Sequence, residues 1–269
     1  MTAGGHPRPR LNLLHGWGLN ARVFDPLLSL LGDAFRPYPV DLPGHGRALW
    51  LEEGFDAQVE RLAAELCDGW LLGWSMGGLY ALALAERYPR RFPGLMLVAS
   101  NPCFVQRADW ACAVDPQLFD AFAAELIEDW QATIRRFIGL QLQGDRGQRA
   151  LIRQVTQALQ EGGAPQPQAL RAGLELLKQR DARDSMKRLA GQGYPLSVLL
   201  GGLDRLVPPC LAAELTGLAP TIGVECWPRS AHAPFLSDTD AFAAWIRRSA
   251  ESAPPGQGGG AQVLQSLRR

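Results

Sequence analysis

The sequence predicts an α/β fold, in which a mainly parallel β-sheet carries helices on both faces. Short runs that are apolar throughout, such as residues 70–74, alternate with stretches of helical spacing, such as residues 56–67. Continuously apolar strands are typical of sheets buried on both faces, and strands that alternate with helices are typical of parallel sheets. A glycine-rich turn after residues 70–74 adds a strand–turn–helix unit to this pattern.

The same two patterns assign the elements in chain order. We expect strands at residues 11–16, 36–44 (a strand that runs into a loop), 70–74, 94–100, 195–202 and 222–228. We expect helices at residues 24–35, 56–67, 77–88, 210–218 and 239–250. Proline at position 89 is expected to end the third of these helices.

Residues 105–189 break the alternation. The helix-like stretches 115–143, 145–160 and 167–179 follow one another with no strand-like run between them. We therefore expect a helical lid inserted over one end of the sheet, with the core formed by residues 1–104 and 190–252. The Gly-rich tail, residues 253–269, is expected to be disordered.

The composition limits the classes of protein. Of 269 residues, 47% are hydrophobic, and 27 basic residues balance 27 acidic ones. We therefore expect no nucleic-acid or membrane partner, and a monomer. Neither a signal peptide nor a membrane-spanning run is evident, so a soluble cytoplasmic protein is expected. The five scattered cysteines contain no CxxC pair, which favours buried free thiols over a disulfide framework or a zinc site.

The most informative motif is Gly73-Trp74-Ser75-Met76-Gly77 at the expected strand–turn–helix. In this context a G-x-S-x-G pattern predicts a sharp turn that presents the serine hydroxyl at the carboxyl edge of the sheet. The N-terminus of the next helix points its N–H groups at the same place. Ser75 is therefore the candidate nucleophile.

A serine hydroxyl needs a base, and the base needs an acid. His232 follows the last expected strand, and Asp204 follows residues 195–202, so both belong at the edge where Ser75 lies. We expect His232 to be the general base and Asp204 the acid that orients it. Asp238 and Asp240 are rival acids, but they follow His232 closely and are expected to begin the next helix.

Acyl transfer also needs donors for an oxyanion. We expect one donor to be the Met76 N–H, and the other to be the Trp17 N–H in the glycine loop 15–18. His15 and His45 belong to glycine loops at the same edge and are expected to be structural.

The motifs LLHGWGLN, VDLPGHGR, LLGWSMGGL, ASNPCF, RFIGLQ and AHAPF together resemble the α/β-hydrolase family. More narrowly, they resemble the esterases that cleave a pimeloyl-[acyl-carrier protein] methyl ester in biotin synthesis. The resemblance spans about residues 11–248. It implies a serine carboxylesterase that needs neither cofactor nor metal and takes its substrate from acyl-carrier protein. The substrate-binding residues that it implies are Trp17, Ser75, Met76, Phe137, Ile138, Gly139, Leu140, Gln141 and His232.

Alternatives remain open within the sequence. A general small-molecule carboxylesterase, a lactonase, a cofactor-free haloperoxidase, or a catalytically silent hydrolase fold that binds a ligand would carry similar motifs. Arginines of the expected lid have two interpretations. They are either a solvated helix face or a docking site for the acidic carrier, and the latter interpretation assigns Arg136, Arg149 and Arg153 to docking.

Overall fold

The sheet in a computed structural model, which describes residues 8–252, has six strands. All pairs are parallel, in the order β2-β1-β3-β4-β5-β6. The strands are β1 (Arg10–Leu14), β2 (Arg36–Val40), β3 (Trp70–Trp74), β4 (Leu95–Val98), β5 (Leu196–Gly201) and β6 (Gly223–Trp227). The predicted fold class is therefore confirmed, whereas the predicted disordered tail lies outside the described residues.

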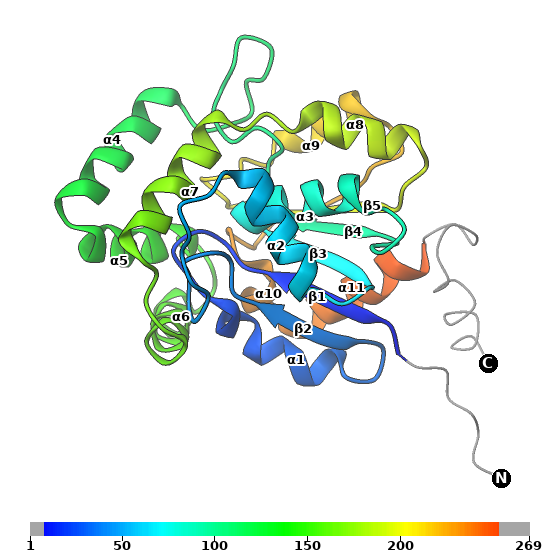
Figure 1. The fold of residues 1–269 in the computed structure, drawn as a ribbon, viewed down its shortest axis with the longest axis horizontal. Helices are drawn as coiled ribbons and strands as arrows, with labels where there is room; N and C mark the ends of the chain where they lie inside the picture. Colours follow the sequence, from blue (N-terminus) through cyan, green and yellow to red (C-terminus); the bar gives the residue numbers. More distant parts are fainter. Residues whose placement is uncertain (1–7, 253–269) are drawn as a thin grey trace.

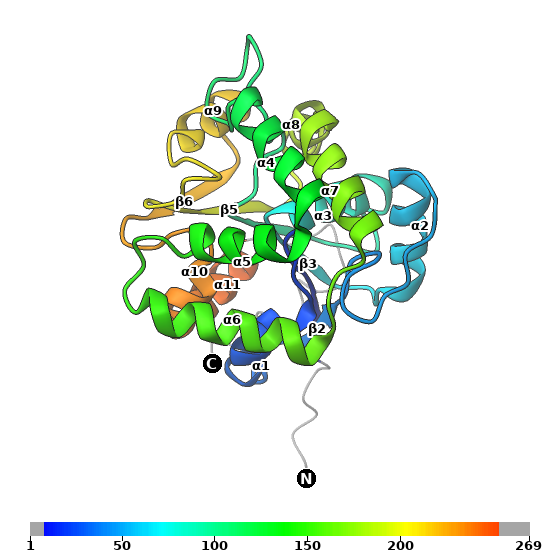
Figure 2. The same cartoon turned by 90° about the vertical axis from the view of Figure 1, so that its left-hand side faces the viewer.

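Helices cover both faces of this sheet. In Figure 2, α1 and α11 lie on one side, and α2, α3, α8 and α9 lie on the other. Their bounds are α1 (Asp25–Leu31), α2 (Phe55–Glu65), α3 (Met76–Arg87), α8 (Arg183–Gly191), α9 (Leu211–Leu218) and α11 (Thr239–Glu251). A 3-10 helix, η1 (Ala21–Phe24), precedes α1, and the short α10 (Pro234–Ser237) precedes α11. The sequence did not predict η1, α8 or α10, and it extended the first helix past Gly32.

The central strand explains the continuous apolar runs. β3 pairs with β1 on one side and β4 on the other, and all five of its residues are buried. Helix α3 packs back on β3 and β4, and β3 and β4 are buried throughout, whereas the edge strands β2 and β6 are partly exposed. Burial of apolar surface on this scale is the main favourable term in folding.

Five helices lie between β4 and β5 in the chain, and the first four of them gather at the left of Figure 1. They are α4 (Pro116–Glu128), α5 (Trp130–Gln141), α6 (Gln148–Gly162) and α7 (Pro167–Gln179). We call α4–α7 the lid helices. The predicted helical stretch 115–143 is two helices, because Asp129 ends α4 and its side chain caps α5 by accepting from the Ala132 N–H.

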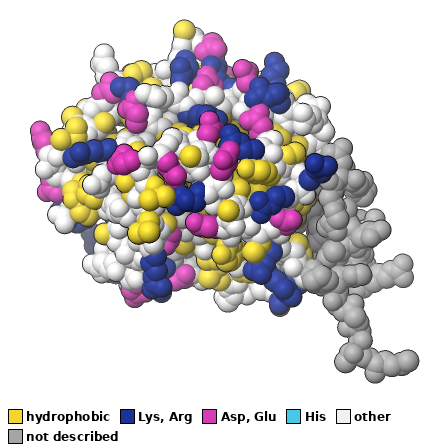
Figure 3. Space-filling view, in the orientation of Figure 1, with side chains coloured by type: hydrophobic (Ala, Val, Ile, Leu, Met, Phe, Trp, Pro, Cys, Tyr) yellow, Lys and Arg dark blue, Asp and Glu magenta, His cyan; other side chains and the backbone are white. Residues whose placement is uncertain are grey.

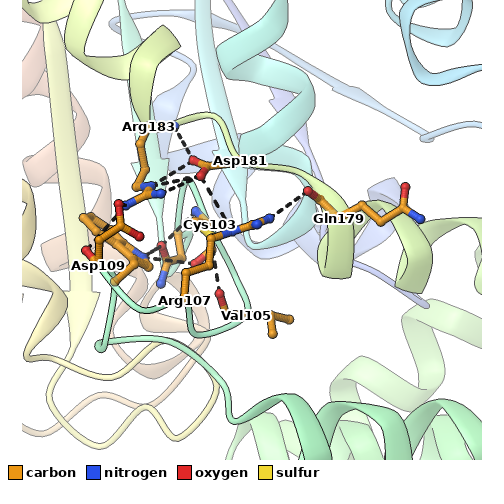
Figure 4. A network of polar contacts seen from close by, with 9 residues as sticks. Cys103, Val105, Arg107, Asp109, Gln179, Asp181 and Arg183 are labelled. Carbon is orange, nitrogen blue, oxygen red and sulfur yellow. Dashed lines mark hydrogen bonds and ion pairs between the residues drawn. The ribbon is translucent and has the colours of Figure 1, made fainter.

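The segment 105–115 enters the lid helices and is tied to their far end by charged contacts (Figure 4). The Arg183 guanidinium binds Asp109 at 2.9 Å and Asp181 at 2.7 Å. Arg107 donates to the Gln179 carbonyl at 2.9 Å. The two ends of the lid region are therefore held side by side.

A disulfide joins Cys112 to Cys210. The expectation of buried free thiols was wrong for these two residues. Cys67, Cys103 and Cys226 are free, but only Cys103 among them is buried, whereas Cys67 is half-buried and Cys226 is exposed. The pair lies 98 residues apart in sequence, and only the fold brings the two Cα atoms to 5.8 Å. The bond links the entry to the lid helices with the start of α9, which follows the Asp204 loop.

The surface carries mixed charge. Basic and acidic side chains are interspersed across the face seen in Figure 3, with apolar side chains between them. Among residues 8–252, no helix is long and apolar enough to span a bilayer.

Candidate active site

Ser75 sits at the turn between β3 and α3 with a backbone φ of 54° and ψ of −123°. A positive φ is costly for a residue with a side chain, so the surroundings must hold it. The Ser75 N–H donates to the Val98 carbonyl at 2.9 Å, and the Ser100 hydroxyl donates to the Ser75 carbonyl at 2.8 Å.

The flanking glycines are required by close backbone approach. A Cβ on Gly73 would lie 2.5 Å from the Cα of Gly78. A Cβ on Gly77 would collide with the carbonyl oxygens of Leu14 and His15 on β1 and its loop. Any side chain at either position would push the turn apart, which explains the glycines on both sides of Ser75.

The structure brings Ser75, His232 and Asp204 into one hydrogen-bonded line. His232 Nε2 lies 2.9 Å from Ser75 Oγ, and its Nδ1 lies 2.7 Å from Asp204 Oδ2. Because a carboxylate only accepts, Nδ1 carries the proton and Nε2 is free to accept from the serine hydroxyl. The other Asp204 oxygen accepts from the N–H groups of Leu206 and Val207. All three side chains are buried, which strengthens their mutual interaction.

The rival acids, Asp238 and Asp240, belong to the start of helix α11. Asp238 is the N-cap of α11 and accepts from the Ala241 N–H at 3.0 Å. Asp240 lies in the first turn of the same helix. Both therefore begin the next helix, as expected, and neither is the hydrogen-bond partner of His232.

Two backbone contacts hold His232 in place. The Trp74 indole Nε1 donates to the His232 carbonyl at 2.7 Å. The His232 N–H donates to the Gln141 carbonyl at 3.0 Å. Sequence reasoning missed both roles, because contacts made through backbone atoms leave no residue-type signal.

The loop 15–18 packs against Ser75. A Cβ on Gly16 would lie 3.2 Å from Ser75 Cβ. The backbone just before Trp17 is therefore in close contact with the Ser75 side chain. Met76 is the first residue of α3, and its N–H has no acceptor within the helix. The Trp17 indole is fixed by donation to the Leu170 carbonyl of α7 at 2.8 Å. The Trp17 N–H in this loop and the Met76 N–H at the start of α3 therefore remain the candidate oxyanion donors.

His15 and His45 shape this loop, as the sequence predicted. His15 Nε2 accepts from the Leu42 N–H at 2.9 Å, and His45 Nε2 accepts from the Gly18 N–H at 3.3 Å. Each Nδ1 donates to a nearby carbonyl, of Gly16 and Pro43 respectively. Burial lowers the pKa of His15 to about 4 and that of His45 to about 3. Both imidazoles are therefore neutral at pH 7, and each bridges two backbone groups by hydrogen bonds.

A cavity of about 490 Å³ opens beside Ser75. Its walls are mainly apolar and come from the lid helices α4, α5 and α7, the loop before them, and the loop after β5. A pocket of this size and character suits a small acyl chain. The lining residues are Trp17, Ser75, Phe104, Val114, Leu118, Phe119, Ala121, Phe122, Glu125, Arg136, Phe137, Leu140, Leu174, Leu177, Arg205 and Leu206.

The expected substrate-binding segment, residues 137–141, lies only partly on the cavity wall. Phe137 and Leu140 line it, whereas Ile138, Gly139 and Gln141 do not. The reason is helical period, because residues three apart on α5 share a face and their neighbours point elsewhere. Met76 and His232 are also absent from the cavity wall, although His232 is hydrogen-bonded to Ser75, which lines it.

The expected docking arginines fall into two groups. Arg136 lines the cavity and pairs with Glu125 of α4. Arg149 and Arg153 are exposed on α6, which packs against α5.

A parallel α/β sheet with a serine elbow, a histidine and an aspartate at its carboxyl edge is the architecture of the α/β class of hydrolases. A family model confirms this class. The chain belongs to the Alpha/beta hydrolase family, whose model matches residues 13–245.

Curated relatives confirm the narrower resemblance. A "Pimeloyl-[acyl-carrier protein] methyl ester esterase" of Stenotrophomonas maltophilia is 37% identical over 93% of this chain and 96% of its own length. One of Klebsiella pneumoniae is 39% identical over 86% of this chain and 90% of its own. An esterase from Exiguobacterium antarcticum shares the fold with a TM-score of 0.77 at 19% identity, covering 93% and 94% of the two chains.

The described part of the chain holds no cluster of three or more His, Cys, Asp or Glu side chains placed to bind a metal ion.

Proposed function

We propose that this chain is a serine carboxylesterase that hydrolyses the methyl ester of a pimeloyl chain carried on acyl-carrier protein. The observation that carries the proposal is the alignment of Ser75 Oγ, His232 and Asp204 beside an apolar cavity. Relatives at 37% and 39% identity bear the name of this activity.

In the proposed reaction, His232 Nε2 takes the Ser75 proton as Oγ attacks the ester carbonyl carbon. The N–H groups of Met76 and Trp17 stabilise the oxyanion of the tetrahedral intermediate. The intermediate collapses, the ester C–O bond breaks, and His232 returns its proton to the departing methanol. Water, deprotonated by His232, then attacks the acyl carbon, the bond from that carbon to Ser75 Oγ breaks, and His232 returns the proton to Oγ, which releases the free acid. Asp204 fixes the tautomer and stabilises the imidazolium throughout.

The cavity walls support an acyl substrate. Phe119, Phe122 and Leu174 offer apolar contacts to a methylene chain, and Trp17 packs edge-on to Phe137 with ring centroids 5.0 Å apart. Burial of a methylene group is worth about 0.8 kcal/mol, so a chain of several methylenes can be held without charge pairing.

The carrier is proposed to dock on arginines at the lid helices. Arg136 lies at the cavity, and Arg149 and Arg153 are exposed on the adjacent α6. Because charge elsewhere on the face seen in Figure 3 is mixed, attraction to an acidic carrier has to be local. Arginine pairs well with both carboxylates and phosphates.

The test compares two substrates. We expect kcat/KM for the carrier-bound methyl ester to exceed that for a short p-nitrophenyl ester by at least roughly 10-fold, because remote contacts contribute to transition-state stabilisation. Methanol release and the mass of the carrier report the reaction. Equal kcat/KM values would instead favour the general small-molecule esterase.

A further inference from the structure

The turn that follows α5 holds the segment that carries His232. Beside the bond from the His232 N–H to the Gln141 carbonyl, Asp145 Oδ1 accepts from the Ala231 N–H at 3.0 Å. The same oxygen accepts from the Ser237 hydroxyl at 2.7 Å. We call residues 231–237 the histidine segment. Asp145 holds it by hydrogen bonds at both of its ends, and Gln141 holds it at His232.

Asp145 is an unusual residue for this place. It is only 5% exposed, and its Oδ2 has no hydrogen-bond partner among the described residues. Desolvation raises the pKa of the Asp145 carboxyl above its usual value, with a smaller contribution from the charge of Asp204, although the bonds from Ser237 and Ala231 act to lower it. A buried carboxyl with an unpaired oxygen costs stability. What offsets this cost is the pair of donors that Oδ1 receives.

We propose that Asp145 is a positioning residue for His232, acting as a hydrogen-bond acceptor that fixes the histidine segment between Ser75 and Asp204. This inference rests on the proposed esterase chemistry of Ser75. An environment that raises the pKa of the Asp145 carboxyl disfavours its negative charge. This supports a role in which the Asp145 oxygen accepts hydrogen bonds, rather than one that depends on its charge. An uncharged acceptor of the same shape should then serve.

The arrangement also links the substrate cavity to the base. Helix α5 contributes Phe137 and Leu140 to the cavity wall, and its last residue, Gln141, accepts from His232. Asp145 follows in the next turn. Contacts that an acyl chain makes with α5 thus act on the same element that positions the imidazole.

The test uses three variants, Asp145→Ala, Asp145→Asn and a matched control, Asp129→Ala. Asp129 caps the other end of α5 and does not touch the histidine segment. Asp145→Ala should lower kcat on a p-nitrophenyl ester by roughly 10- to 100-fold, because small misplacement of a catalytic group is costly, with KM within about 2-fold. Asp145→Asn keeps a carbonyl oxygen and should stay within roughly 3-fold of wild type.

The control separates positioning from stability. Asp129→Ala loses a helix cap and should lower Tm by roughly 2–4 °C while kcat stays unchanged. Unchanged kcat in Asp145→Ala, or an equal loss in Asp145→Asn, would overturn the inference. If Asp145→Ala fails to fold, Ser237→Ala removes one donor to Oδ1 and should still lower kcat by roughly 3-fold with KM unchanged. Unchanged kcat in that variant overturns the inference equally.

A readout that does not depend on esterase activity keeps the two proposals apart. The downfield proton NMR resonance of His232 Nδ1–H reports its bond to Asp204. It should persist in wild type and Asp145→Asn and be lost or broadened in Asp145→Ala. A wild type that hydrolyses no ester defeats the proposed function. In that case loss of the resonance in Asp145→Ala still supports the positioning role, and its persistence there overturns it.

Discussion

His232 Nε2 lies 2.9 Å from Ser75 Oγ, although 157 residues separate the two in sequence. The sheet accounts for this meeting. Ser75 follows β3 and His232 follows β6, and parallel strands place their carboxyl ends at one edge. Asp204 follows β5 at the same edge, between the other two elements in chain order. The predictions below test what this arrangement does.

Asp204→Asn should lower kcat by roughly 10³–10⁴ with little change in KM, because the amide can no longer accept from Nδ1–H with a full charge. Steady-state kinetics on a p-nitrophenyl ester measures both constants. Asp238→Asn is the matched control, since Asp238 caps α11 and does not contact His232. The assignment of the acid fails if the Asp238 variant loses kcat and the Asp204 variant does not.

Arg136, Arg149 and Arg153 changed together to Ala should lower kcat/KM on the carrier-bound ester by roughly 10-fold. Added salt should reduce the difference in kcat/KM between this variant and wild type, because salt screens the attraction between exposed charges. A charge-matched control changes Arg36, Arg90 and Lys187, which are exposed outside the lid helices. Hydrolysis of a p-nitrophenyl ester should hardly change in either triple variant. Equal losses on both substrates would mean that the arginines only support the lid.

Acid should destabilise the fold through His15 and His45. Their folded pKa values, about 4 and about 3, lie below the ordinary value of 6.5. The unfolded chain therefore binds more protons below pH 6.5, and each histidine should remove up to about 1.4 kcal/mol of unfolding free energy per pH unit. Asp145 has a raised pKa in the folded state, so its protonation should increase the unfolding free energy on acidification. This is one group, whereas two histidines act to lower the unfolding free energy. Urea unfolding at pH 7.5, 6 and 5 measures the trend, and a flat or rising stability on acidification contradicts it.

The disulfide should contribute to stability. Cys112 and Cys210 close a loop with a sequence separation of 98, for which the typical gain is about 2–4 kcal/mol. Under oxidising conditions Cys112→Ser should therefore lower Tm, and Cys226→Ser, at an exposed free thiol, should not. Thiol titration of the denatured, unreduced wild type should find three thiols. Five titrating thiols would show that the bond does not form.

Much of the fold was predictable because burial leaves a direct mark on the sequence. The run Trp70–Trp74 is apolar throughout because β3 is covered on both faces. The glycines at 73 and 77 marked the turn, since only backbone fits there. These two signals, with strands that precede Asp204 and His232, were enough to predict which side chains meet. The catalytic roles of those side chains stay predictions.

What the sequence could not supply depends on how separate pieces are rotated and packed. The period of α5 was readable, but which of its faces lines the cavity was not, so the expected segment included Ile138, Gly139 and Gln141, which lie off the cavity wall. The bond between Cys112 and Cys210 joins distant segments that no local pattern connects. The hydrogen bond from the Trp74 indole to His232 is accepted by a backbone carbonyl, which any residue at position 232 would provide.

The central claim is that Ser75 is an activated nucleophile, and a fluorophosphonate probe tests it most directly. Incubation of the full chain, followed by peptide mass spectrometry, should find one stoichiometric adduct, located on Ser75. Ser75→Ala should take no label and should lose ester hydrolysis by more than the roughly 10²–10³-fold that a single oxyanion donor is worth. No adduct on the wild type, or an adduct on another residue, would contradict the account and favour a silent hydrolase fold that only binds its ligand.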